Sequence, residues 1–89
     1  MISTEITIIN KLGLHARAAA KLVSTASAYS SKIRIGHNGK LVDGKSIMAV
    51  MMLAAGKGTD LTLEIEGEDQ NLALDAVTTL INNRFDEGE

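Results

Sequence analysis

Asn10-Lys-Leu-Gly-Leu-His15-Ala-Arg17-Ala-Ala-Ala-Lys21 is the stretch that decides how this chain folds. An alternating β-type pattern ends just before it, and a helical pattern begins inside it. Gly13, His15 and Arg17 fall together at this junction. A helix N-terminus carries backbone N–H groups without intrahelical partners and the positive end of the helix dipole. The stretch therefore predicts an anion site with an imidazole and a guanidinium at its mouth.

Outward from this junction, alternation of apolar and polar residues predicts strands with one apolar and one polar face each. The predicted strands span Ile2 to Ile8, Lys32 to Gly36, Lys40 to Asp43 and Asp60 to Glu66. The inward residues of the first strand are Ile2, Thr4, Ile6 and Ile8. The segment His37-Asn38-Gly39 predicts a tight hairpin turn, because Asn-Gly tolerates the positive φ angles that such a turn needs.

Apolar residues at helical spacing predict helices between and after these strands. The first helix begins at Ala16, with Leu22 on its flank and an inner face of Ala16, Ala19, Ala20, Val23 and Ala26. The second spans Ile47 to Ala54, with Ser46 as its N-cap. Asp69 is predicted to cap the third helix, whose inner face is Ala73, Ala76, Val77, Leu80 and Ile81. The tail is expected to fray beyond Phe85.

The resulting order β-α-β-β-α-β-α predicts an α+β fold, with a four-stranded, mainly antiparallel sheet and three helices on one face. A doubly wound parallel sheet is disfavoured, because its strands would be apolar on both faces. The 89 residues are enough for one small domain, so we expect a single domain over 1–89.

Composition excludes several functions. The net charge is −2 and there is one Tyr, one Phe and no Trp, so no nucleic-acid surface is predicted. Without a signal-peptide pattern or a long apolar run, we expect a cytoplasmic protein with no membrane partner. There is no Cys, and His37 is expected to be a solvated turn residue, so neither a metal site nor a cofactor is predicted.

Arg17 in the first helical turn carries a functional signal. A cation at the positive end of a helix is unfavourable by roughly a few tenths of a kcal/mol, which indicates that an anion belongs there part of the time. An imidazole can act as a nucleophile, and an arginine can bind a phosphate through two hydrogen bonds. Phosphoryl transfer through His15 is therefore favoured over a histidine that only caps the helix.

Two motifs, Gly13-Leu14-His15-Ala16-Arg17 and Gly44-Lys45-Ser46-Ile47-Met48, resemble those of the HPr family. These are the histidine-containing phosphocarrier proteins of bacterial phosphoenolpyruvate-dependent phosphotransferase systems. The resemblance extends from Glu5 to about Phe85 and implies an open-faced sandwich with the element order predicted above. The family usually has Pro where this chain has Ala18. That difference and the ending Asn83-Arg-Phe85-Asp-Glu resemble the nitrogen-related branch, called NPr.

The resemblance implies roles for the residues at the junction. Nδ1 of His15 would accept a phosphoryl group from enzyme I and pass it to a IIA-type protein, in a sugar or a nitrogen-related system. Arg17 would steady the phosphate, and the backbone N–H groups of Ala16 and Arg17 would bind it. Such a protein is a stoichiometric carrier rather than an enzyme, and we expect it to act as a monomer.

Ser46 matches a serine that a dedicated kinase, the HPr kinase/phosphorylase, phosphorylates in some bacteria. As an N-cap, Ser46 needs no kinase to have a role. The helix that follows has no polar face, so part of its apolar surface must be exposed. The residues expected to bind partner proteins are Lys45, Ile47, Met48, Met51 and Met52, with Lys21 and Lys57 also placed to ring the apolar surface.

Two other functions stay open at this stage. The first is a regulatory binding module of the same fold, which would act through Ser46 and the surface from Met48 to Met52 while His15 stays silent. The second is a domain that binds a small ligand on its sheet.

Overall fold

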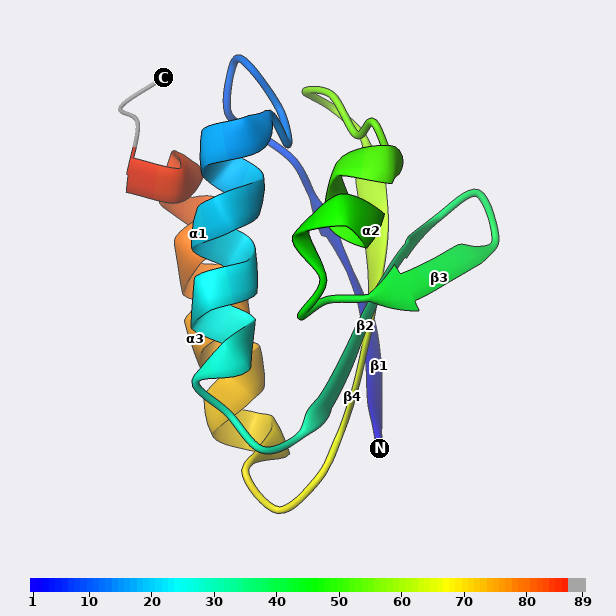
Figure 1. Ribbon diagram of the computed structural model, residues 1–89, viewed down its shortest axis with the longest axis vertical. Coiled ribbons are helices and arrows are strands. Elements are labelled where there is room, and N and C mark those ends of the chain that lie inside the picture. Colours follow the sequence, from blue (N-terminus) through cyan, green and yellow to red (C-terminus); the bar gives the residue numbers. More distant parts are fainter. Residues whose placement is uncertain (87–89) are drawn as a thin grey trace.

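The computed structural model describes residues 1–86, and its elements follow the predicted order (Figure 1). They are β1 (Ile2–Thr7), α1 (Ala16–Ser27), β2 (Lys32–His37), β3 (Lys40–Asp43), α2 (Ile47–Met52), β4 (Asp60–Glu66), α3 (Gln70–Asn82) and a short 3-10 turn η1 (Arg84–Asp86). Each strand agrees with its predicted bounds to within one residue. The turn η1 is the one addition within residues 1–86.

The strands form a sheet in the order β1-β4-β2-β3, and every pairing among residues 1–86 is antiparallel. The helices cover one face of this sheet (Figure 1). Side chains on that face are buried, among them Ile33, Ile35, Leu61, Leu63 and Ile65. On the uncovered face, Arg34 and Glu64 are cross-strand partners with a 3.5 Å ion pair. The predicted α+β sandwich is confirmed.

Helix α1 is rotated relative to the prediction. Its buried residues are Ala18, Ala19, Leu22 and Ala26, whereas Ala16 and Ala20 are exposed. The prediction that turned Ala16 and Ala20 inward and left Leu22 on the flank was therefore wrong. Alanines carry little apolar surface, so their spacing hardly sets the rotation of the helix, and burial of the larger Leu22 side chain decides it.

Helix α2 is shorter than predicted and ends at Met52 rather than Ala54. Leu53 is its C-cap, and Ala54 adopts a φ of +51° that stops the helix. Leu53 and Ala55 are then both buried while Ala54 is exposed. The left-handed conformation costs a non-glycine residue about 1–2 kcal/mol, and burial of these two neighbours offsets it.

The C-terminal end of the described chain is anchored by Phe85, whose side chain is fully buried. On α3, Ala73, Val77 and Ile81 are buried as predicted. Asp86 accepts a hydrogen bond from the Asn83 side chain, and the remainder of the tail that was predicted to fray, 87–89, lies outside the described residues.

Asp69 occupies the N-cap position of α3, but its side chain does not cap that helix, contrary to prediction. The carboxylate instead accepts hydrogen bonds from the backbone N–H of Ser30 and of Ser31, both at 2.9 Å, and from the Ser31 hydroxyl. A side chain on Gly67 would collide with Ser31, 2.7 Å from its Cα. Asp69 thus joins the α1–β2 and β4–α3 connections, at the end of the molecule opposite the loop before α1 (Figure 1).

Because of these bonds, we expect the stability of the fold to depend on pH in the acidic range. The Ser31 hydroxyl first, and then the Ser30 N–H, lower the pKa of Asp69 from 3.8 to about 2. In that interval the unfolded chain binds more protons, so the stabilisation is present above pH 3.8 and is lost as pH falls towards 2. We expect the urea midpoint of the wild type to fall more steeply over this range than that of Asp69→Asn.

Asp75→Asn, on the exposed face of α3, serves as the matched control and should keep the wild-type steepness. Equal pH profiles for the wild type and Asp69→Asn would contradict the assignment.

Candidate functional site

The loop between β1 and α1 is pressed against the segment that follows α2. Gly13 has a φ of +65°, and a Cβ at this position would lie 2.5 Å from the Ala55 carbonyl oxygen and 2.6 Å from Gly56 Cα. The N–H of Leu14 donates to the same Ala55 oxygen at 2.8 Å. Gly39 also has a positive φ, of +81°, yet a Cβ there would meet nothing within 4 Å. Position 13 therefore excludes a side chain on two grounds, conformation and space.

His15 is the N-cap of α1, as predicted. Its backbone is extended, with φ −73° and ψ 176°, and its carbonyl oxygen accepts the first helical bond from Ala19 at 2.8 Å. The imidazole makes no capping hydrogen bond and the residue is only half-buried. The imidazole therefore lies at the N-terminus of α1 without capping the helix.

The first turn of α1 supplies donors and a positive potential. As at any helix start, the N–H groups of Ala16 and Arg17 have no acceptor within the helix. No acidic side chain lies in this turn of α1. The dipole of the helix is thus left unneutralised by its own first turn, and an anion placed at His15 would be stabilised there.

Arg17 is exposed on the first turn and lines an open groove of about 410 Å³ between α1 and the end of the described chain. Within residues 1–86, no hydrogen bond or ion pair engages its guanidinium. Lys21, one turn later, differs because its Nζ donates to the Phe85 carbonyl oxygen at 2.7 Å. Of these two cations, Arg17 is the one that can turn to an anion at His15.

Ser46 caps α2 as predicted, because its Oγ accepts a hydrogen bond from the Ala49 N–H at 3.4 Å. The neighbouring Lys45 is half-buried, and its Nζ donates to the Tyr29 carbonyl oxygen at 2.7 Å. Lys45 therefore fastens the start of α2 to the chain after α1, a structural contact that the sequence did not indicate.

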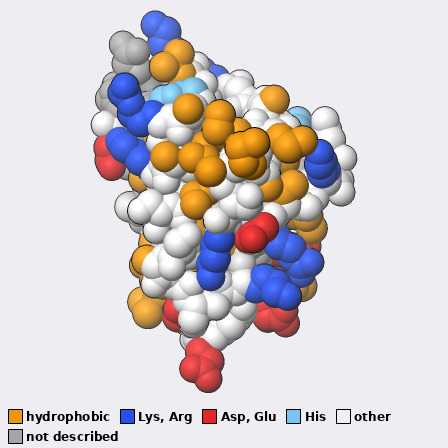
Figure 2. Space-filling model, in the orientation of Figure 1, with side chains coloured by type: hydrophobic (Ala, Val, Ile, Leu, Met, Phe, Trp, Pro, Cys, Tyr) orange, Lys and Arg blue, Asp and Glu red, His pale blue; other side chains and the backbone are white. Residues whose placement is uncertain are grey.

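Apolar side chains gather on the face that carries α2, near a histidine and several cationic side chains (Figure 2). The methionine patch, as we name it, consists of four exposed residues on α2, which are Ile47, Met48, Met51 and Met52. Met48 and Met52 are the most exposed, at 70% and 68%. Sequence reasoning missed Leu12, which is 66% exposed in the loop before His15. The signal in the sequence for this exposed residue was a leucine within a turn that ends in a glycine.

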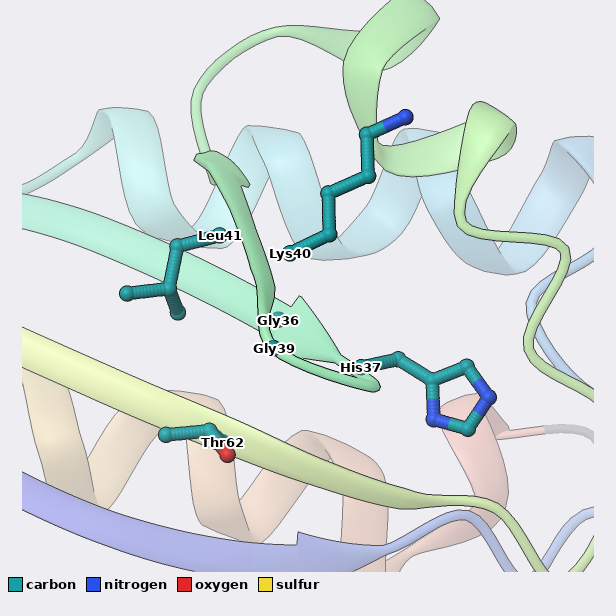
Figure 3. Close-up of a pocket in the computed structure, with 6 residues that line it drawn as sticks. All are labelled: Gly36, His37, Gly39, Lys40, Leu41 and Thr62. Carbon is teal, nitrogen blue, oxygen red and sulfur yellow. The ribbon is translucent and has the colours of Figure 1, made fainter.

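The other histidine belongs to a separate hollow of about 130 Å³ (Figure 3). His37 is the last residue of β2 rather than a turn residue and is half-buried, and the turn itself is Asn38-Gly39 with φ angles of +56° and +81°. Its ring points away from Leu41 and Thr62, so no set of functional groups converges there. Among residues 1–86, no cluster of His, Cys, Asp or Glu could hold a metal ion.

Within residues 1–86, no helix is long and apolar enough to cross a membrane.

Fold and site together define a class of small open-faced α+β proteins that present one histidine at the N-terminus of their first helix. The family model described as "PTS HPr component phosphorylation site" matches residues 2–83. The chain belongs to the HPr family, the phosphocarrier proteins of the phosphotransferase system.

Individual relatives agree over their whole length. The phosphocarrier protein HPr of Pseudomonas aeruginosa is 67% identical over 90 residues, and that of Pseudomonas putida is 62% identical, with complete coverage of both chains in each case. Among solved structures, HPr-C-His from Thermoanaerobacter tengcongensis has a TM-score of 0.94 at 44% identity and 98% coverage of both chains.

Proposed function

We propose that residues 1–89 act as one phosphocarrier domain, in which Nδ1 of His15 accepts a phosphoryl group from a phosphorylated enzyme I and donates it to a IIA-type protein. The observation that carries this proposal is the position of the imidazole, which stands at the start of α1 without capping it. The relatives named phosphocarrier protein HPr support it. The protein would act as a cytoplasmic monomer.

In the proposed reaction the Nδ1 lone pair of His15 attacks phosphorus, and the bond between phosphorus and the nitrogen atom of enzyme I that carries it, the donor nitrogen, breaks. The donor nitrogen leaves with the electron pair, and the phosphoryl group keeps its negative charge throughout. The N–H groups of Ala16 and Arg17, the helix dipole and the Arg17 guanidinium would stabilise that charge. The protein would be a stoichiometric carrier and not an enzyme, because the phosphoryl group resides on His15 itself between donor and acceptor and no substrate is converted in a pocket of its own.

The methionine patch is proposed as the surface that binds enzyme I and the acceptor. Flexible thioether side chains adapt to differently shaped partners, which suits a protein that must dock on at least two of them. Leu12 would extend this surface to the edge of the site. We propose Ser46 as a regulatory site for an HPr kinase/phosphorylase, where a phosphate would add negative charge beside Met48.

Phosphoenolpyruvate, Mg²⁺ and a cognate enzyme I should phosphorylate the wild type, seen as an acid-labile mass increase of one phosphate. His15→Ala should abolish it, and Arg17→Ala should slow it about tenfold or more, because a charge-assisted contact to the phosphate is lost. A label that persists in His15→Ala, or never appears in the wild type, would refute the carrier mechanism. Sugar-type and nitrogen-type enzyme I, assayed in parallel, identify the branch.

Met48→Glu should raise the KM for enzyme I, because it places a carboxylate in the centre of an apolar docking surface. Leu72→Glu is the matched control, since Leu72 is 64% exposed on α3 and lies outside the methionine patch. Equal KM values for the two variants would argue against docking on the patch. Partner binding that survives His15→Ala but not Met48→Glu, without phosphorylation of the wild type, would instead favour a regulatory binding module.

A further inference from the structure

Asn10 is a buried polar residue in the loop that carries His15. Its side chain is fully buried, and within residues 1–86 Ser31 is the one other polar residue that is comparably buried. The Asn10 Nδ2 donates to the Gly13 carbonyl oxygen at 2.9 Å, and the Gly13 N–H donates back to the Asn10 carbonyl oxygen at 3.2 Å. Two hydrogen bonds between Asn10 and Gly13, the first and last residues of the turn, thus close it.

The Gly13 end of this turn also packs against the backbone of Ala55 and Gly56. Lys11 and Leu12 at its tip are exposed, so packing does not fix them. Before the turn, Ile8 is paired with the chain after α2, through its N–H to the Thr59 carbonyl oxygen at 2.9 Å. After the turn, Leu14 is held by Ala55. Between these two anchors the Asn10 amide is fully buried and bonds directly to the backbone of Gly13, two residues before His15.

We propose that Asn10 is a positioning residue for phosphoryl transfer, an inference that rests on the proposed function of His15. Without its amide, the buried Gly13 carbonyl loses a donor, and the backbone immediately before His15 can relax to regain one from water. The imidazole would then no longer be held in one fixed position relative to the first N–H groups of α1. Misplacement of a reacting group by about 1 Å can slow a reaction by about 100-fold.

A merely structural role would lower stability without touching transfer. The chain offers a matched control, because Ser31→Ala removes the other buried polar side chain at the far end of the molecule, where it bonds to Asp69. Both substitutions delete a hydrogen bond made by a buried side chain, but only Asn10 lies in the loop that leads to His15.

The experiment measures kcat and KM for acceptance of the phosphoryl group from enzyme I, at a temperature where circular dichroism shows each variant folded. We expect Asn10→Ala to lower kcat about tenfold or more with KM nearly unchanged, since the methionine patch is intact. Ser31→Ala should keep both values. If Asn10→Ala does not fold, Asn10→Ser, which leaves a smaller cavity and a hydroxyl, is measured instead.

Asn10 and Ser31 variants with the same kcat, or Asn10 variants of which none folds, would overturn the inference and leave Asn10 a purely structural residue. A wild type that accepts no phosphate would instead show that the proposed function itself has failed.

Discussion

The approach of the Gly13 backbone to that of Ala55 and Gly56 is the contact on which the site depends. A left-handed residue without a side chain is required there, so the chain can leave β1, turn and enter α1 directly beside the end of α2. One contact thereby sets two surfaces next to each other. The start of α1 gains its position over the sheet, and the methionine patch becomes the neighbouring surface of the same face (Figure 2).

The two ends of the molecule use polar groups in opposite ways. At the Asp69 end the carboxylate accepts hydrogen bonds from the Ser31 hydroxyl and from two backbone N–H groups, and these bonds join the α1–β2 and β4–α3 connections. At the His15 end the first turn of α1 contains no acidic partner, and Arg17 has no bond within residues 1–86. The Asp69 carboxylate is therefore fully used in structure, whereas the dipole at the start of α1 is not neutralised by an acidic side chain of its own first turn and can stabilise a transient anion.

Much of this arrangement could be predicted from the sequence, and the failures have physical causes. The strands were predictable because each has one buried and one exposed face, which the sequence shows as alternation with period two, and His15 and Ser46 were predictable because helix starts have local signatures. The rotation of α1 was not, since its alanines bury too little area to decide it against Leu22. The role of Asp69 was missed because its partners, Ser30 and Ser31, are remote in sequence. Leu12 and Asn10 belong to the same turn, and only the structure shows that Leu12 is exposed and Asn10 is buried.

The proposed mechanism requires that a phosphate on His15 be bound by the first N–H groups of α1. The most direct measurement is the amide ¹H–¹⁵N NMR spectrum of the protein before and after phosphorylation by enzyme I. The amide protons of Ala16 and Arg17 should move downfield when they acquire a charged acceptor, and those of Ser31 and Asp69 at the opposite end should not move. Unchanged Ala16 and Arg17 resonances in the fully phosphorylated protein would contradict the mechanism, because the phosphate would then be held without the helix N-terminus.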